Sequence, residues 1–253
     1  MRKLVPAPTN TLEDAGPYIT LGMCYASNPE TGESDVTIHR MCLQSRDEIS
    51  IFLQPGARHI GYFRELAEAA GKPLPISISI GVDPAIEIAA CFEPPTTPLG
   101  YDELQAAGAI RKAPVELVKC LTINEKAIAN AEYVIEGEIL PGVRVQEDQN
   151  SHTVKAMPEF PGYCGPANPS LPIIKVKAVT TRFQADLDLI PIPGVQRHPL
   201  DPSNQPEYAP GIRARGVACK TIFDCTVPFD QKDRFERARF MDLDPAHWLP
   251  ELF

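Results

Sequence analysis

The sequence has 253 residues, of which 43% are hydrophobic, and this is enough to bury one sizeable core. Its formal net charge of −9 and the lack of any run rich in lysine and arginine argue against a nucleic-acid partner. Its apolar runs are too short for a membrane helix and its seven cysteines are scattered singly, so we expect a reduced, cytoplasmic protein with neither a zinc site nor a disulfide framework.

Most of the periodic segments along the chain are strands. Period-two alternation and β-branched residues predict strands at 18–26, 35–43, 48–53, 75–81, 115–123, 132–140, 172–180 and 187–192. Helical periodicity is clearest over 58–70, and Gly71 ends that helix, while shorter helices are predicted at 84–92, 101–108 and 230–241. Strands outnumber helices and do not alternate with them. The pattern therefore predicts an α+β fold around an antiparallel or mixed, barrel-like sheet.

One boundary is predicted from composition. Proline, asparagine and glycine interrupt all periodicity over 193–212, and we divide the chain into a domain of residues 1–182 and a C-terminal segment of residues 183–253. The C-terminal segment reads as a strand, a turn and a charged helix. Because a segment of that size cannot hold its own core, we expect it to dock on the main domain or on a neighbouring subunit.

A charged residue lies among the apolar positions of one predicted strand, SDVTIHRM at 34–41. With a period of two, Val36, Ile38 and Arg40 share one face, and Asp35 lies on the other. A buried arginine needs an anionic partner. The alternative interpretation is an ordinary salt bridge at the end of a strand.

Two further polar residues are set in apolar context. His59 opens the helix predicted at 58–70, and Glu116 lies in the strand PVELVKCLTI. Together with Asp35 they make an oxygen, nitrogen and oxygen set that suits Mg²⁺ or Mn²⁺. Spacing is compatible with that set but does not establish it, because a histidine at a helix start is more often structural and a strand glutamate more often faces solvent.

The segment VQEDQNSHTVKAMPEFPGY, residues 145–163, has no helical or strand period. It carries Glu147 and Glu159 on either side of His152. A long irregular loop inside a compact domain is uncommon and is often functional. The alternative is a solvated loop whose acidic residues face water.

Taken in order, these segments resemble the UbiD family of reversible decarboxylases. The most specific part of the resemblance is the combination of ELVKC at 116–120, AEYVIEGEI at 131–139 and EFPGY at 159–163. The order and approximate spacing match as well. The resemblance covers most of residues 10–182 and returns in PGVQRHPLDPS and in KTIFDCTVPFDQKDRFERARF.

The resemblance implies a split β-barrel-like flavin-binding domain with a few short helices. Members of the family use prenylated flavin mononucleotide (prenylated FMN), made by a separate flavin prenyltransferase, and a divalent metal with a monovalent cation, K⁺ or Na⁺, nearby. By position in the motifs, the metal ligands would be Asp35, His59 and Glu116. The wider cofactor site would add Thr37, Ile38, His39 and Arg40. Asp35 departs from the asparagine that the family usually has there.

The same positions imply a mechanism for a non-oxidative, reversible decarboxylation of an aromatic or α,β-unsaturated acid. Arg40 would orient the substrate carboxylate or the cofactor and pair with Glu147, and Glu159 would protonate the carbon that loses CO₂. The loop EDQN, followed by His152, resembles the branch that acts on hydroxybenzoates and other phenolic acids. There His152 could contact a ring hydroxyl. A homo-oligomer is expected.

The chain departs from the family in length. The stretch VKAVTTRFQADLDLIPIPG joins two places that lie far apart in full-length members, so much of the second domain is expected to be missing. Two hypotheses follow: an active decarboxylase whose cleft a partner or subunit completes, and a non-catalytic module that binds flavin and metal. A third, an FMN-dependent reductase barrel, gives no reason for the ELVKC and EFPGY elements.

Overall fold

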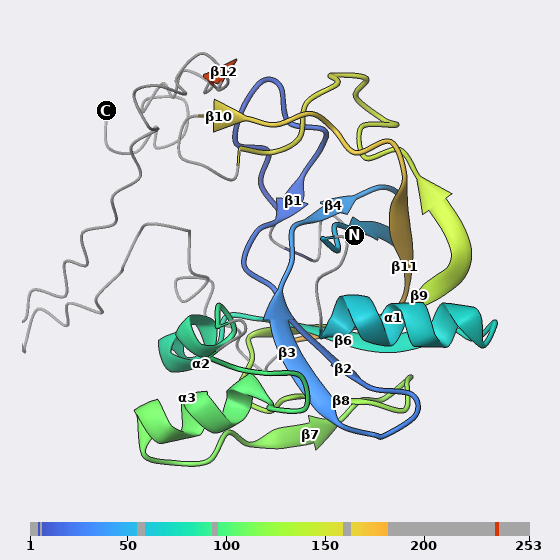
Figure 1. The fold of residues 1–253 in the computed structure, drawn as a ribbon. Helices are drawn as coiled ribbons and strands as arrows, with labels where there is room; N and C mark the ends of the chain where they lie inside the picture. The colour runs from blue at the N-terminus through green and yellow to red at the C-terminus, as the bar shows by residue number, and fades with distance from the viewer. Residues whose placement is uncertain are drawn as a thin grey trace, which may run out of the picture.

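The structure is a computed structural model, and it describes residues 5, 7–54, 59–92, 96–158, 163–181 and 236–237 (Figure 1). Its centre is one eight-stranded sheet in which every neighbouring pair of strands is antiparallel. From one edge to the other the order is β1 (Tyr18–Ile19), β4 (Met41–Leu43), β5 (Glu48–Ile51), β11 (Leu171–Thr181), β9 (Tyr133–Val145), β6 (Leu74–Ile80), β2 (Met23–Ser27) and β3 (Ser34–Ile38).

The connection from β3 to β4 makes this sheet curl. β3 is one edge of the sheet and β4 is next to the other edge, yet only His39 and Arg40 separate the two strands along the chain. Two residues span less than about 8 Å, so the two edges must come close together. The result is a split barrel with a seam at His39 and Arg40. This confirms the predicted α+β, barrel-like fold.

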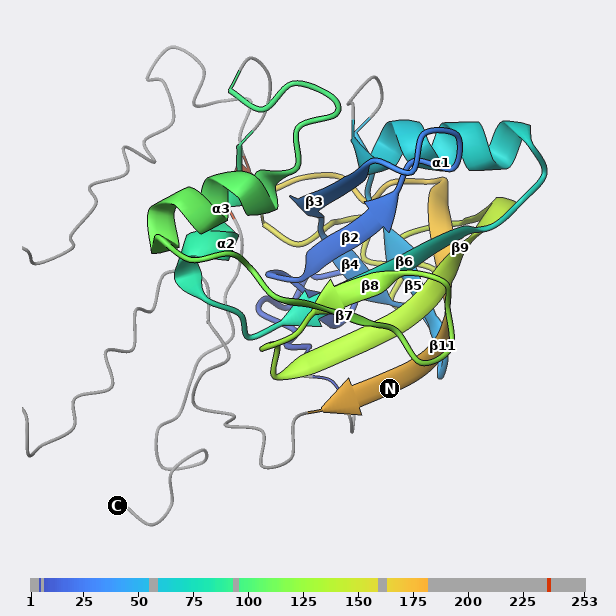
Figure 2. The same ribbon diagram turned by 90° about the horizontal axis from the view of Figure 1, so that it is seen from below.

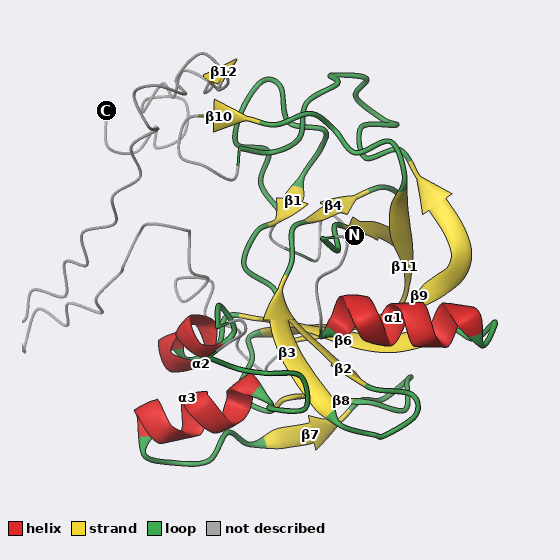
Figure 3. Cartoon of the chain, in the orientation of Figure 1, coloured by secondary structure: helices red, strands yellow, loops and turns green. Residues whose placement is uncertain are grey.

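Three helices accompany the sheet: α1 (Ile60–Ala69), α2 (Pro84–Ala89) and α3 (Glu103–Arg111). α1 packs along β2, β6 and β9, whereas α2 and α3 pack on each other at the side of β3 (Figures 2 and 3). The α2 and α3 helices begin at aspartate caps, because Asp83 accepts from the Ala85 N–H and Asp102 from the Leu104 N–H, each at 2.8 Å. None of the helices in the described part of the chain is long and apolar enough to cross a membrane.

The largest buried cluster lies between α1 and the curled sheet. Phe63 and Ile60 of α1 are almost fully buried against Ile76 and Ile78 of β6 and Ile135 of β9. The helix face therefore matches the predicted apolar stripe of residues 58–70. A second cluster joins α2 and α3 to β2 and β3, and it holds the segment that carries Asp35 against the two helices.

Two glycines permit close approaches within the barrel. A Cβ at Gly22 would lie 2.7 Å from Ile78 and 2.8 Å from Met41, so the chain passes the sheet at a place where only glycine fits. The strand predicted at 18–26 is divided there into β1 and β2. A Cβ at Gly137 of β9 would lie 2.8 Å from the main-chain oxygen of Lys175, so glycine lets β11 pair closely with β9.

The structure also corrects several predicted elements. The strand predicted at 35–43 is divided at the seam, and the one at 115–123 shortens to β7 (Leu117–Lys119), which pairs with the unpredicted β8 (Lys126–Ile128). The helix predicted at 230–241 is wrong at its two described residues, because β12 (Glu236–Arg237) pairs with β10 (Tyr163–Cys164). The strand at 187–192 and most of the C-terminal segment lie outside the described residues. The domain boundary and the docking of that segment stay predictions.

Candidate functional site

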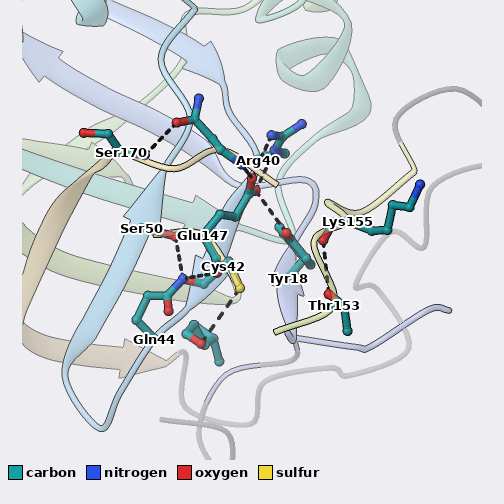
Figure 4. Close-up of polar contacts among 11 residues, drawn as sticks. Tyr18, Arg40, Cys42, Gln44, Ser50, Glu147, Thr153, Lys155 and Ser170 are labelled. Carbon is teal, nitrogen blue, oxygen red and sulfur yellow. Dashed lines mark hydrogen bonds and ion pairs between the residues drawn. The ribbon is translucent and has the colours of Figure 1, made fainter. Parts of the chain in front are cut away.

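Arg40 and Glu147 form a buried ion pair at the seam of the barrel (Figure 4). Arg40 donates from Nε to Oε1 of Glu147 at 2.8 Å and from Nη2 to Oε2 at 3.0 Å. The side chains are 10% and 0% exposed. The guanidinium also lies over the ring of Phe52, 4.4 Å from its centroid. The predicted anionic partner of Arg40 is therefore present, and it is Glu147.

The carboxylate of Glu147 is fully engaged. Beside the two bonds from Arg40, Oε1 accepts from the Tyr18 hydroxyl at 3.0 Å and Oε2 accepts from the Asn168 N–H at 2.9 Å. A carboxylate that accepts four hydrogen bonds is fixed in position, so Glu147 holds the guanidinium of Arg40 in place.

The loop that carries Glu147 is anchored at its base. Glu147 donates its main-chain N–H to the Asn168 carbonyl at 2.9 Å, which closes the segment between β9 and β11. Gln44, which follows β4 and is 6% exposed, donates from its amide to the Glu147 carbonyl and to the Ser50 hydroxyl, each at 2.8 Å. Its amide oxygen accepts from Gln149 and Asn150. The start of the loop is therefore fixed to the barrel.

Hydrogen bonds also hold the part of the loop that follows Glu147. The buried carboxylate of Asp148 accepts from the Val154 N–H at 2.8 Å, and the Ala156 N–H bonds the Gly165 carbonyl at 2.9 Å. His152 is exposed, with a φ of 55°, and its N–H bonds the Asp148 carbonyl. Its imidazole takes part in no polar contact with the described residues. Glu159 lies outside the described residues, so its predicted role stays a prediction.

A second buried polar cluster brings together Asp35 of β3, His59 at the start of α1 and Glu103 at the start of α3. One potential ligand atom from each lies within 4.8 Å of the others. The residues are 2%, 5% and 0% exposed. His59 Nδ1 contacts Asp35 Oδ2 and lies 3.9 Å from Glu103 Oε1. Within the described part of the chain, Asp35 Oδ1 and both carboxylate oxygens of Glu103 have no hydrogen-bond partner.

A hydrogen bond next to the cluster fixes its geometry. Ser34, which precedes Asp35, donates its hydroxyl to Asp102 at 2.6 Å, and Asp102 is the N-cap of α3. Glu103 is thereby held against Asp35 by its neighbour. Burial, together with the adjacent Asp35, raises the pKa of Glu103 well above its usual range. The cluster therefore contains carboxylate oxygens that no described residue satisfies with a hydrogen bond.

The third predicted metal ligand lies elsewhere. Glu116 is exposed immediately before β7, its carbonyl accepts from the Ala129 N–H, and it is not part of the cluster. The structure thus brings together Asp35 and His59 but adds Glu103 where the sequence predicts Glu116. Glu103 has a weak sequence signal, since Asp102 followed by a glutamate is typical of an ordinary helix start.

The predicted cofactor-contacting residues lie on the edge strand. Thr37 and Ile38 end β3, which has no neighbouring strand on one side among the described residues, and His39 follows them at the seam. Thr37 Oγ1 lies 2.7 Å from His39 Nε2. Desolvation lowers the pKa of His39 to about 4, so its imidazole is neutral at pH 7. An edge strand leaves alternate main-chain groups available for a ligand.

Comparisons with known proteins agree with this architecture. Residues 1–194 match the model of the family described as "UbiD: 3-octaprenyl-4-hydroxybenzoate carboxy-lyase Rift-related domain". The chain is 42% identical to a gallate decarboxylase of Lactiplantibacillus plantarum, with 98% of the chain and 72% of that protein covered. The alignment runs over 357 positions, more than the 253 residues of this chain, so part of the relative has no counterpart here.

Solved structures give the same result. The apo structure of 3,4-dihydroxybenzoic acid decarboxylase from Klebsiella pneumoniae is 44% identical, with a TM-score of 0.68 that covers 100% of this chain and 74% of the other. An evolved dimeric form of the UbiD-class enzyme HmfF from Pelotomaculum thermopropionicum, solved in complex with prenylated FMN, is 43% identical with a TM-score of 0.64. That match covers 73% of this chain and 40% of the other.

Proposed function

The chain belongs to the UbiD family, and from that membership we propose that it is a carboxy-lyase that decarboxylates a hydroxylated aromatic acid reversibly and without oxidation. The observation that carries the proposal is the buried Arg40–Glu147 pair at the barrel seam. The Asp35–His59–Glu103 cluster begins five residues earlier on the same segment. The two most similar relatives described above act, by name, on gallate and on 3,4-dihydroxybenzoic acid, which supports a phenolic substrate.

The residues present fit the cofactors that the family resemblance implies. Prenylated FMN, when bound, supplies the ring system that accepts the electrons left behind as CO₂ departs. The open edge of β3 at Thr37, Ile38 and His39 would hold the flavin. Asp35 and His59 would hold the divalent ion, Mn²⁺ or Mg²⁺, beside its phosphate, with K⁺ or Na⁺ nearby. The buried oxygens without partners support this assignment, because they are the hard ligands that such ions take.

Two carboxylates compete for the third metal position. The family motif points to Glu116, which is exposed, and the packing of α3 points to Glu103, which is buried. Asp35 itself adds a negative charge at a position where the family usually has asparagine. A divalent cation offsets that charge, whereas the flavin phosphate alone would be repelled by it.

Each side chain of the seam has a separate role in this proposal. Arg40, held by the two hydrogen bonds that it donates to Glu147, would bind and orient the substrate carboxylate or the cofactor. Glu147 positions Arg40. The proton that replaces CO₂ comes from an acid of the site, and the EFPGY motif supports Glu159 as its donor. His152, on the same loop, would contact a ring hydroxyl of the substrate.

The test uses protein produced together with a flavin prenyltransferase. Native mass spectrometry and an absorption spectrum measure cofactor loading, and CO₂ release is measured from 3,4-dihydroxybenzoate and gallate. We expect a loaded homo-oligomer that releases CO₂, and a Glu159→Gln variant that stays loaded but is slower by about 10²- to 10⁴-fold. A loaded protein that releases no CO₂ from any hydroxybenzoate, or an undiminished Glu159→Gln variant, would refute the proposal.

A non-catalytic module that binds flavin and metal is the second candidate. The observation in its favour is that the alignment with the gallate decarboxylase is longer than this chain. Such a module would load cofactor and metal in the same experiment and release no CO₂. If activity appears only when chains associate, the cleft is completed by a neighbouring subunit, and dilution below the dissociation constant of the oligomer should abolish turnover while cofactor stays bound.

A further inference from the structure

We propose that Tyr18 is a positioning residue for the Arg40–Glu147 pair, because its buried hydroxyl fixes the carboxylate that holds the guanidinium of Arg40. The inference rests on the proposed function, since Arg40 is the residue that would orient the substrate carboxylate or the cofactor. Nothing in the sequence pattern singles out Tyr18, which lies in β1 at one edge of the sheet. Its contacts in the folded protein carry the inference.

The first argument is that the Tyr18 hydroxyl and Arg40 meet at one atom. The hydroxyl donates to Oε1 of Glu147 at 3.0 Å, and the same oxygen accepts from Nε of Arg40 at 2.8 Å (Figure 4). Tyr18 is 0% exposed. Water therefore cannot take over the hydrogen bond without a rearrangement of the core, and the placement of Oε1 depends on the tyrosine itself.

The second argument is what each hydrogen bond on the Glu147 carboxylate fixes. The two bonds from Arg40 hold the carboxylate and the guanidinium to each other. The bond from the Asn168 N–H comes from the same segment between β9 and β11 that carries Glu147. The bond from Tyr18 ties the carboxylate to β1, and it joins residues 129 positions apart in the sequence. Tyr18 thus gives the pair and its loop a fixed point on the barrel.

The third argument is that Tyr18 is itself held as a rigid donor. It packs in one buried cluster with Ala15 and Cys42, and Met157 lies against that cluster. Its strand pairs with β4, where Cys42 is its partner. Burial, with the adjacent Cys42 and Glu147, raises the pKa of Tyr18 far above its usual range, so the hydroxyl keeps its proton at neutral pH. A group held in this way supports a precise site, because its neighbours lock its position.

The alternative is that Tyr18 is an ordinary core aromatic whose hydroxyl has simply found a partner. The two readings differ in what the loss of the hydroxyl changes. An ordinary core residue contributes stability to the whole fold. A positioning residue controls the Glu147 carboxylate in particular, and the amide of Asn168 reports on that carboxylate directly, because its N–H donates to Oε2 of Glu147 at 2.9 Å.

The experiment measures amide hydrogen exchange by nuclear magnetic resonance on the full chain without flavin. Tyr18→Phe removes one oxygen and keeps the ring, so the variant should fold, and thermal melting checks this. Exchange at Asn168 should accelerate by about three- to tenfold more than exchange at the amides of β6 and β9, as expected for the loss of one hydrogen bond. The same comparison in the original protein gives the reference.

The matched control is Tyr133→Phe. Tyr133 is also a buried tyrosine, 8% exposed, but it opens β9 and packs in the cluster between α1 and the sheet. No described hydrogen bond joins it to Glu147, whose carboxylate partners are Tyr18, Arg40 and Asn168. This variant should leave exchange at Asn168 unchanged relative to the strands.

The second measurement is turnover of 3,4-dihydroxybenzoate by protein loaded with prenylated FMN. Tyr18→Phe should load the flavin to the same extent, and its kcat/KM should fall by about 10- to 100-fold, because a displaced Arg40 no longer orients the bound group. Tyr133→Phe should keep the kcat/KM of the original protein. A variant with equal loading and equal stability but lower kcat/KM separates positioning from a general loss of folded protein.

Unchanged relative exchange at Asn168 in Tyr18→Phe would overturn the inference, whether or not the protein turns over. Undiminished kcat/KM in a loaded Tyr18→Phe variant would overturn it as well. If the original protein releases CO₂ and either result is found, the inference fails and the proposed function stands. If exchange at Asn168 accelerates as expected and the original protein decarboxylates no hydroxybenzoate, Tyr18 still positions the pair and the proposed function fails.

Discussion

Two buried acidic centres share the segment that carries Asp35 and Arg40, and they differ in how well their carboxylate oxygens are satisfied. At the seam, the carboxylate of Glu147 accepts four hydrogen bonds, two of them from Arg40. In the Asp35–His59–Glu103 cluster, three carboxylate oxygens have no hydrogen-bond partner among the described residues. A site that is complete without a ligand serves to position other groups. A group of several unsatisfied oxygens suits a ligand that binds all of them, because burying such oxygens without a partner costs free energy.

The two centres are also supported differently. Glu147 sits on a loop and depends on long-range anchors from Tyr18, Gln44 and Asn168. Glu103 sits on the first turn of a helix, and one bond between Ser34 and Asp102 places it. The comparison predicts that substitutions in the Arg40–Glu147 pair lower the stability of the folded protein. Substitutions in the Asp35–His59–Glu103 cluster should instead lower its affinity for a ligand.

The largest effect is expected from Arg40→Met. This change removes the cation but leaves the buried carboxylate of Glu147, so the free energy of unfolding should fall by about 3–5 kcal/mol. Urea denaturation of the metal-free and flavin-free protein measures it. The double variant Arg40→Met with Glu147→Gln should recover part of that loss, because no unpaired charge remains. A loss below about 1 kcal/mol for the single variant would mean that the pair is not the complete, stabilising centre described above.

A smaller effect is expected from Gln44→Ala. The change removes an amide that bonds Ser50 and the Glu147 carbonyl, and it leaves buried partners unpaired at a cost of about 1–3 kcal/mol. Amide hydrogen exchange should also accelerate at Val154 and Ala156, which are ordered by the anchored loop. Gln146→Ala is the control, since that side chain is exposed on the same loop and should cost less than about 0.5 kcal/mol. Equal exchange in the two variants would show that the loop is ordered without Gln44.

The sequence predicted the seam better than the cluster, for a physical reason. Arg40 stands out because a charge among alternating apolar residues must find a buried partner, and the family resemblance implied that this partner is Glu147. The strands of the barrel were also predicted closely, since period-two alternation reports a half-buried sheet directly. Tyr18 was not predicted, because an aromatic residue in an apolar strand looks like ordinary core.

The sequence pattern could not show that Glu103 belongs to the buried cluster. An acid in the first turn of a helix is favoured by the helix dipole wherever the helix lies, so its presence says nothing about burial. Only the packing of α3 on β3, through Ser34 and Asp102, shows that this acid faces Asp35. Gln44 was missed for the same reason: its role depends on a loop that is a hundred residues away in the sequence.

The smallest predicted effect on stability concerns a third buried acid, Glu87. Burial, together with the carboxylate of Asp83, raises the pKa of Glu87 to about 7. Between the ordinary value near 4.5 and pH 7, the folded protein holds a proton that the unfolded chain has lost. Stability therefore falls as the pH rises through this window and levels off above pH 7. Glu87→Gln removes that dependence, and the variant should be more stable than the original by about 1 kcal/mol at pH 8 after discounting for solvent.

Urea denaturation at pH 5 and pH 8 measures the difference, with the exposed Glu30→Gln as control. A gain that grows between the two pH values would show that a buried carboxylate outside any site is simply a cost. Asp35 and Glu103 are also buried carboxylates with unsatisfied oxygens, and they lie close to each other. Glu103→Gln should likewise not destabilise the metal-free protein. An equal gain for Glu87→Gln at both pH values would remove the basis for treating an unpartnered buried carboxylate as a cost in this protein.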